Sequence, residues 1–152
     1  NITYDNWRLP TVVDTGTPGC NYANTGTDCG FNVDTATSEM AHLYYDELGN
    51  KAFRDTSGNE QSGWGLTNTG PFTNFQADLY WSATEYATLT SSAWFFTFYF
   101  GKQYAEDKWD GFHALAVSPG DVGAVAAVPE AQTYALMLAG LGLIAWRARR
   151  RG

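Results

Sequence analysis

The pattern of hydrophobic and polar positions predicts one helix in the first part of the chain. In residues 38–48 (SEMAHLYYDEL), apolar side chains recur at helical spacing and would form one buried face. These apolar residues are Met40, Leu43, Tyr44 and Leu48. Ser38 is a favourable N-cap, and Gly49 is suited to end the helix in a left-handed conformation.

Two aromatic runs predict strands. Residues 79–84 (LYWSAT) form the first, and residues 93–100 (AWFFTFYF) are apolar at nearly every position, as expected for a central strand that is covered on both faces. Residues 112–118 (FHALAVS) predict a closing strand, and residues 7–10 a short strand or turn. Long loops rich in Gly, Asn and Thr separate these segments. We therefore expect an α+β fold with short antiparallel strands and one main helix.

The composition changes after residue 121. Residues 122–128 (VGAVAAV) are small and apolar and predict a linker, so the body would comprise residues 1–121. Residues 131–146 carry no charge, and as a helix they would span about 24 Å of a hydrocarbon core about 30 Å thick. We predict a single, short transmembrane helix. A buried core helix is the alternative, which the basic chain end disfavours.

The charge distribution limits the partners. The chain has 16 acidic and 9 basic residues and a net charge of −7. Four of the basic residues lie in the last six positions: Arg147, Arg149, Arg150 and Arg151. By the positive-inside rule they would anchor the cytoplasmic end of the helix, with the body outside. The remaining chain is strongly acidic, which argues against nucleic acid as a partner.

The end of the chain resembles a known sorting signal. A short motif, an apolar helix (TYALMLAGLGLIAW) and a basic tail (RARRR) follow one another, and the motif is Val128, Pro129, Glu130 and Ala131. Together they resemble the PEP-CTERM domain of Gram-negative bacteria, which would occupy residues 129–152. The resemblance implies export, transient insertion in the inner membrane and cleavage by an exosortase near the motif. The body would then reach the cell surface or the exopolysaccharide matrix.

Two motifs in the body carry a second resemblance. The sequences NWRLPT at residues 6–11 and YWSATEY at residues 80–86, with the strand that begins at Ala93, resemble the Lcl C-terminal-domain family. Domains of that family are similar to C-type lectins and to formylglycine-generating enzymes. The resemblance covers about residues 5–120 and implies a C-type-lectin-like body, whose first strands would precede Asn1.

We interpret both motifs as structural. Trp7 and Trp81 would be core residues, since each indole buries a large area and needs one hydrogen-bond partner. Arg8 would pair with a buried carboxylate such as Glu85 and so join two distant segments. This interpretation leaves the motifs to explain the fold and not an activity.

The candidates for covalent or metal chemistry are few. Cys20 and Cys29 are the only cysteines, and an even count in a short, loop-rich, exported chain predicts one disulfide. Their spacing does not fit a zinc site. His42 would lie on the helix surface, and His113 would be partly buried and hydrogen-bonded. The cysteines do not match the pattern of the formylglycine-generating enzymes, so we expect no enzymatic activity.

The densest acidic cluster is the best candidate for a ligand surface. Aromatic side chains flank its carboxylates, a combination suited to carbohydrate; the residues are Tyr104, Glu106, Asp107, Trp109 and Asp110. Lectin-like folds often bind calcium, and residues 24–28 and 55–60 offer oxygen ligands on glycine-containing loops. Neither loop fits the EF-hand pattern, so we expect no cofactor. For the acidic cluster itself we favour a solvated loop, with a ligand surface as the alternative.

Taken together, these features predict an exported, exosortase-processed surface or matrix protein. Its body would be a non-enzymatic binding or adhesion module, with polysaccharide as a candidate ligand. Two alternatives stay open: an oxidase of the formylglycine-generating type and a purely structural matrix protein. The expected partners are the exosortase and, transiently, the membrane.

Overall fold

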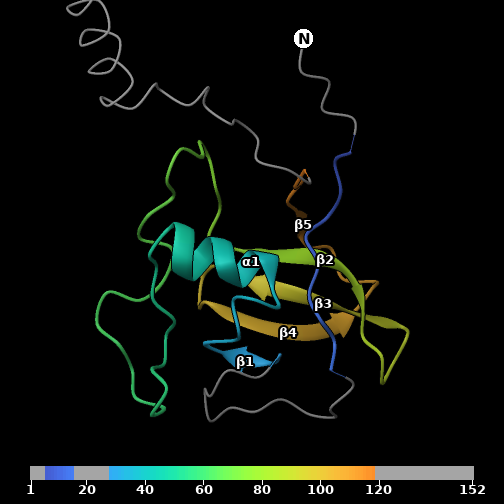
Figure 1. Ribbon diagram of the computed structural model, residues 1–152, viewed down its shortest axis with the longest axis horizontal. Coiled ribbons are helices and arrows are strands. Elements are labelled where there is room, and N and C mark those ends of the chain that lie inside the picture. The colour runs from blue at the N-terminus through green and yellow to red at the C-terminus, as the bar shows by residue number, and fades with distance from the viewer. Residues whose placement is uncertain (1–5, 16–27, 119–152) are drawn as a thin grey trace, which may run out of the picture. The chain divides into compact units, whose positions relative to one another are not determined.

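The computed structural model describes residues 6–15 and 28–118. Within them a five-stranded sheet has the order β1-β4-β3-β2-β5, and a short helix lies across one of its faces (Figure 1). The elements are β1 (Gly30–Phe31), α1 (Glu39–Ala41), η1 (His42–Glu47), β2 (Leu79–Glu85), β3 (Ser92–Thr97), β4 (Lys102–Asp107) and β5 (His113–Ala114). The predicted α+β class is confirmed.

Strand β3 is the centre of the sheet, and all six of its residues are buried. It pairs in antiparallel register with β2 on one side and β4 on the other, with Phe95 opposite both Trp81 and Tyr104. The prediction of a central strand covered on both faces is therefore confirmed. The strand is shorter than the aromatic run, because the chain turns after Thr97; Phe98 is still buried, but Tyr99 and Phe100 are exposed.

The helix predicted for residues 38–48 begins where expected. The Ser38 hydroxyl accepts a hydrogen bond from the Ala41 amide at 3.2 Å and so caps the first turn. From His42 to Glu47 the backbone is wound as a π-helix. The predicted apolar face packs inward: Met40, Tyr44 and Leu48 are buried, and Leu43 is partly buried.

The core lies between this helix and the sheet. The Tyr44 ring contacts the rings of Phe96 and Phe98, with centroids 5.4 and 5.8 Å apart. Tyr44 also donates a hydrogen bond from its hydroxyl to the Lys51 carbonyl at 2.9 Å, which satisfies the polar end of a buried side chain. Gly49 follows the helix with φ +66°, as its predicted role at the helix end requires.

The first and last described segments lie side by side. Arg8 and Val117 exchange backbone hydrogen bonds of 2.9 and 2.8 Å. The predicted closing strand is reduced to β5, which pairs with β2 in parallel and not antiparallel register. The chain must return from the end of β4 before it joins β2, and the loop at residues 108–112 brings it alongside β2 in the same direction.

The predicted linker, transmembrane helix and basic tail lie outside the described residues. Within residues 6–15 and 28–118, no helix has the length and apolar character that crossing a bilayer requires.

Candidate functional site

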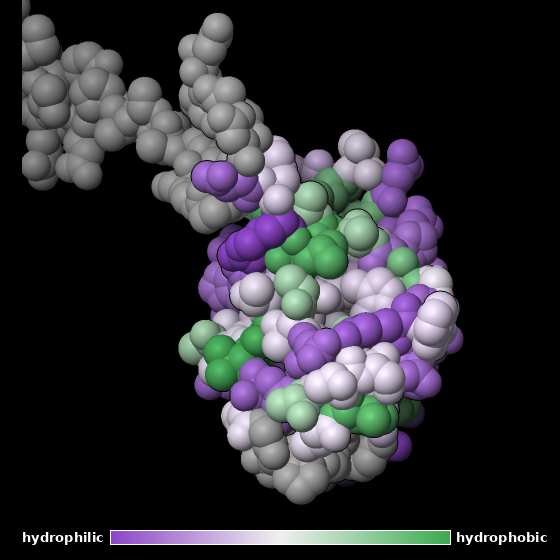
Figure 2. Space-filling model, turned by 90° about the vertical axis from the view of Figure 1, so that its right-hand side faces the viewer, coloured by the Kyte–Doolittle hydropathy of each residue, from purple (hydrophilic) through white to green (hydrophobic). Residues whose placement is uncertain are grey.

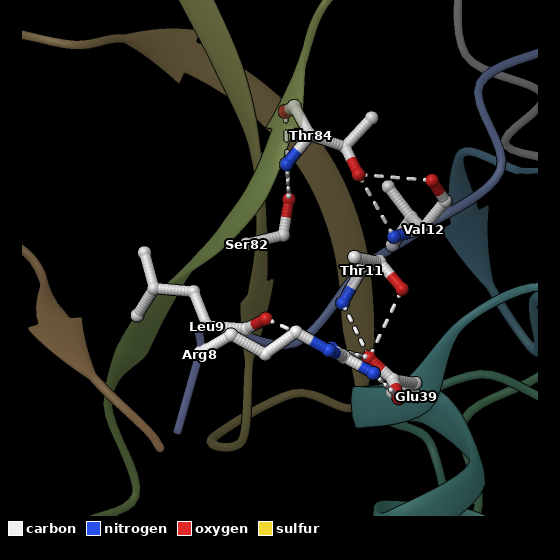
Figure 3. A network of polar contacts seen from close by, with 7 residues as sticks. All are labelled: Arg8, Leu9, Thr11, Val12, Glu39, Ser82 and Thr84. Atoms are coloured by element: carbon white, nitrogen blue, oxygen red, sulfur yellow. Dashed lines mark hydrogen bonds and ion pairs between the residues drawn. The ribbon is translucent and has the colours of Figure 1, made fainter. Parts of the chain in front are cut away.

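The two sequence motifs of the body meet around the helix N-terminus (Figure 3). Arg8 donates from both terminal nitrogens to the Glu39 carboxylate, at 2.6 and 2.7 Å. The Thr11 backbone amide donates to the same carboxylate at 2.6 Å, and the Thr11 hydroxyl donates to it at 3.0 Å. The hydrogen bonds from Arg8 and Thr11 lower the pKa of Glu39 to about 2. Glu39 is thus held as a carboxylate that ties the N-terminal segment to the helix.

The predicted pairing of Arg8 with Glu85 is wrong. Glu85 lies at the end of β2, after a shift of register, and there it forms an ion pair with Lys108. Arg8 instead reaches Glu39, in the first turn of the helix. The expected link between the two motifs exists but is made by the backbone, because the Ala83 amide donates to the Pro10 carbonyl at 2.8 Å. Directly after the first motif, the Thr84 hydroxyl accepts from the Val12 amide at 3.0 Å and donates to the Val12 carbonyl at 2.9 Å.

The prediction that Trp7 is a core residue is also wrong, because its side chain is 56% exposed. Trp81 is half-buried and stacks on Phe112, with centroids 4.5 Å apart. Among the described tryptophans the fully buried one is Trp94 on β3, whose indole nitrogen donates to the Asp14 carboxylate at 2.8 Å. Both motifs therefore serve the fold, as expected, but through other partners.

Both histidines lie on the surface. His42 is exposed, as predicted, and Nδ1 is 2.9 Å from the Asp46 carboxylate. His113 was expected to be partly buried, and this is wrong: β5 is an edge strand with both residues exposed. Its Nε2 lies 3.1 Å from the Asp78 carboxylate. Across the part of the chain that the structure describes, no three His, Cys, Asp or Glu side chains gather in a way that would hold a metal ion.

The loop at residues 55–60 uses its carboxylate internally. Asp55 accepts hydrogen bonds from the amides of Ser57 and Asn59, both at 2.8 Å. The amide of Asn59 is the main cause of the lowered pKa of Asp55. In the other oxygen-rich loop only Asp28 is described, and its carboxylate accepts from the Thr15 amide at 2.9 Å. These contacts give both carboxylates a role in holding their loops.

Cys29 is 2% exposed and disulfide-bonded. Its predicted partner, Cys20, lies outside the described residues, so the pairing stays a prediction. The sorting residues Val128, Pro129, Glu130 and Ala131 and the basic anchor Arg147, Arg149, Arg150 and Arg151 lie outside them too.

The predicted ligand surface is assembled at one end of the sheet. Three of its residues end strand β4, and the other two sit in the turn that follows: Tyr104, Glu106, Asp107, Trp109 and Asp110. A hydrogen bond of 3.0 Å from the Asp110 amide to the Asp107 carbonyl closes this turn. Trp109 is 92% exposed at its tip. Figure 2 faces this end of the sheet, where hydrophobic and hydrophilic side chains are interspersed.

A pocket of about 290 Å³ lies against the same end of β4. The buried side chains of Trp94 and Cys29 form its floor. Further lining comes from Tyr86, Leu89, Ser92, Tyr104, Ala105, Glu106 and Asp107. The β4 side of this pocket was predicted from the sequence, whereas Tyr86, Leu89 and Trp94 were not.

The missed residues belong to the β2–β3 hairpin. The antiparallel pairing of β2 with β3 places loop 86–91 at the same end of the sheet as the last residues of β4. The Lys108 amide donates to the Ser91 carbonyl at 3.0 Å and holds the two tips together. The aromatic runs alone could have indicated this hairpin, but not the register that sets Trp94 beside Ala105.

The mouth of the pocket is acidic. Glu106 and Asp107 are exposed, and neither forms an ion pair with any residue in the described ranges. Lys108 follows them directly, but its ammonium group is held by Glu85 and the Thr90 carbonyl. The ammonium group of Lys102 lies 4.6 Å from the Tyr104 ring centroid.

A second pocket, of about 360 Å³, lies beside the helix. Thr11, Glu39 and His42 are among its lining residues. The Glu39 carboxylate already accepts hydrogen bonds from Arg8 and Thr11, so its negative charge is paired with Arg8 and is not available to a ligand. The pocket beside β4, whose carboxylates form no ion pair with a described residue, is therefore the better candidate for a ligand.

Residues 127–151 match the family model of the PEP-CTERM protein-sorting motif. The chain thus carries a PEP-CTERM sorting motif. The motif marks an exported protein that is anchored transiently in the membrane through its C-terminus, and it implies an exosortase as processing partner. No curated protein and no solved structure matches the chain. The likeness of the body to C-type lectins therefore remains a prediction.

Proposed function

We propose that this exosortase substrate is a surface or matrix protein whose body binds polysaccharide without catalysing a reaction. The binding surface would consist of the turn at residues 107–110 and the adjoining pocket. The observation that carries the proposal is Trp109, which is 92% exposed and lies two residues after Asp107, a carboxylate in the pocket lining.

An indole in this position is unusual for a purely structural role. Tryptophan contributes to stability mainly by burying its large apolar surface, and Trp109 buries almost none of it. The turn nevertheless fixes its backbone through the hydrogen bond between Asp110 and Asp107. An exposed ring on a backbone held in this way offers a stacking surface to the apolar face of a sugar.

The surrounding groups complete such a site. Sugar-binding sites need a few polar groups that fix the orientation of the ligand beside apolar surface. Glu106 and Asp107 supply acceptors for sugar hydroxyls, and the pocket between Tyr86 and Tyr104 supplies apolar walls. The PEP-CTERM motif supports exposure of this surface to extracellular material, because the body is exported.

The absence of catalysis is part of the proposal. The most strongly perturbed carboxyl group described, Glu39, is engaged by Arg8 and Thr11 and holds the fold. The two histidines lie at separate surface sites, each beside an acidic partner. These arrangements favour a binding module over the oxidase alternative.

A glycan array with the exosortase-processed protein tests the proposal. We expect binding to at least one class of polysaccharide, weakened about fivefold or more by Trp109→Ala, since one aromatic contact contributes about 1 kcal/mol. Tyr99→Ala is the matched control, because this aromatic side chain is also exposed but belongs to the β3–β4 turn at the other end of these strands. Equal losses from both variants, or no binding to any glycan, would contradict the proposal.

A further inference from the structure

We infer that the pocket beside β4 selects glycans that carry protonated amino groups over neutral and anionic glycans. The inference rests on the proposed function and names the class of sugar that the site would prefer. It follows from the two carboxylates at the mouth of the pocket and from the aromatic side chains that line it.

The pocket combines an apolar interior with acidic edges. Trp94 is 1% exposed and lies at its base, with the Tyr86 ring edge-on to it at 5.2 Å between centroids. Glu106 and Asp107, the last two residues of β4, line the opening. A sugar ring that lies against Tyr86 would bring its substituents close to Asp107, which shares a face of the sheet with Trp94.

The charges at the mouth are available to a ligand. Among the described residues, neither Glu106 nor Asp107 is in an ion pair, whereas the neighbouring Glu85 is matched by Lys108. A bound ammonium group would therefore gain a carboxylate partner without breaking an existing pair. Asp110 adds a third negative charge within the turn.

The same charges would repel a glycan that carries carboxylates. The net charge of the whole chain is −7, so the long-range field adds to the local repulsion. An anionic membrane surface would be disfavoured for the same reason. A neutral sugar would bind through the aromatic side chains alone, with intermediate affinity.

The dimensions of the pocket limit the occupant to a small unit. Its volume of about 290 Å³ is close to the lower limit of small-molecule sites, about 300 Å³. One monosaccharide of a longer polymer fits that size. The next sugars along the polymer would lie over the adjoining turn, where Trp109 is exposed.

Fluorescence titration with three tetrasaccharides tests the inference. They are the tetramers of glucosamine, of N-acetylglucosamine and of galacturonic acid. The titrations are made at about pH 5.5, where amines carry a proton and carboxylates are ionised. We expect the glucosamine oligomer to bind about tenfold more tightly than the N-acetylated one, and the galacturonic acid oligomer to bind most weakly. The double variant Glu106→Gln/Asp107→Asn should remove this order, since each exposed pair is worth up to about fivefold.

The control variant is Glu47→Gln/Glu60→Gln, which removes the same charge from exposed sites outside the pocket lining. It should keep the preference for glucosamine. If it loses the preference as fully as the pocket variant does, the net charge is responsible and the inference is wrong. If the N-acetylated oligomer binds as tightly as the glucosamine oligomer, the inference is wrong but the proposed function stands. If no oligomer binds and anionic vesicles do, both are wrong.

Discussion

The contact between Arg8 and Glu39 should make a measurable, pH-dependent contribution to the stability of the body. We predict that Glu39→Gln lowers the free energy of unfolding at neutral pH, because glutamine cannot form the charged, two-pronged contact with the Arg8 guanidinium. The change keeps the size of the side chain, so lost packing does not contribute. It also keeps an oxygen that can accept from the Thr11 amide.

The magnitude follows from the acid–base behaviour of Glu39. Its pKa falls from an ordinary value of 4.5 to about 2, which corresponds to an upper limit of about 3 kcal/mol. The carboxylate side chain is 39% exposed, so solvent screens the pair, and we expect about 1–2 kcal/mol. A carboxyl group whose pKa is lowered in the folded state stabilises the fold at pH values above its pKa in the unfolded chain. This stability is lost as the pH falls from about 4.5 toward about 2, where the folded protein also takes up the proton.

Urea unfolding at a series of pH values measures this effect. The difference between the wild type and Glu39→Gln should be largest near neutral pH and should shrink as the pH falls below about 4.5. Glu60→Gln serves as the control, because Glu60 is exposed and forms no ion pair with a described residue. A difference that is constant across the pH range would refute the proposed role of the charge.

Local patterns were sufficient to predict the central elements of the fold. Apolar residues at helical spacing predicted that one face of the helix would be buried, and Met40 and Tyr44 on this face are both fully buried. The uninterrupted aromatic run predicted β3 because a strand that is covered on both faces has no polar side to alternate with. Ser38 was identified as a cap because a hydroxyl at that position satisfies a free amide of the first turn.

Partners across the chain were not predictable in the same way. The sequence shows that Arg8 needs a carboxylate, but which one it meets depends on the path of residues 6–15 over the helix. Trp7 illustrates the same limit, because its size favours burial and yet the neighbouring Arg8–Val117 bridge holds it at the edge of the body, 56% exposed.

Some residues of the candidate site could be predicted from the sequence, and others could not. Tyr104 to Asp110 are close together in the sequence and form one strand end and one turn. Their proximity in the structure could therefore be predicted from the sequence. Tyr86 and Trp94 join them only through the register of β3 against β4. A sequence pattern fixes which face a residue occupies, and the pairing of strands decides what lies opposite.

Two further predictions concern the turn after β3 and the chain end. Gly101→Ala should destabilise the body by about 2–4 kcal/mol in urea unfolding, since Gly101 has φ +61° and a Cβ there would lie 2.5 Å from the buried Tyr44 ring. Gly63→Ala, with φ +71° and open space around it, should cost only about 1 kcal/mol, and equal losses would contradict the clash. Mass spectrometry of the processed protein from its host should find a C-terminus near Pro129, because we expect the exosortase to cleave near the start of the PEP-CTERM motif. A mature chain that retains Arg147 to Arg151 would show that the motif acts as a permanent anchor.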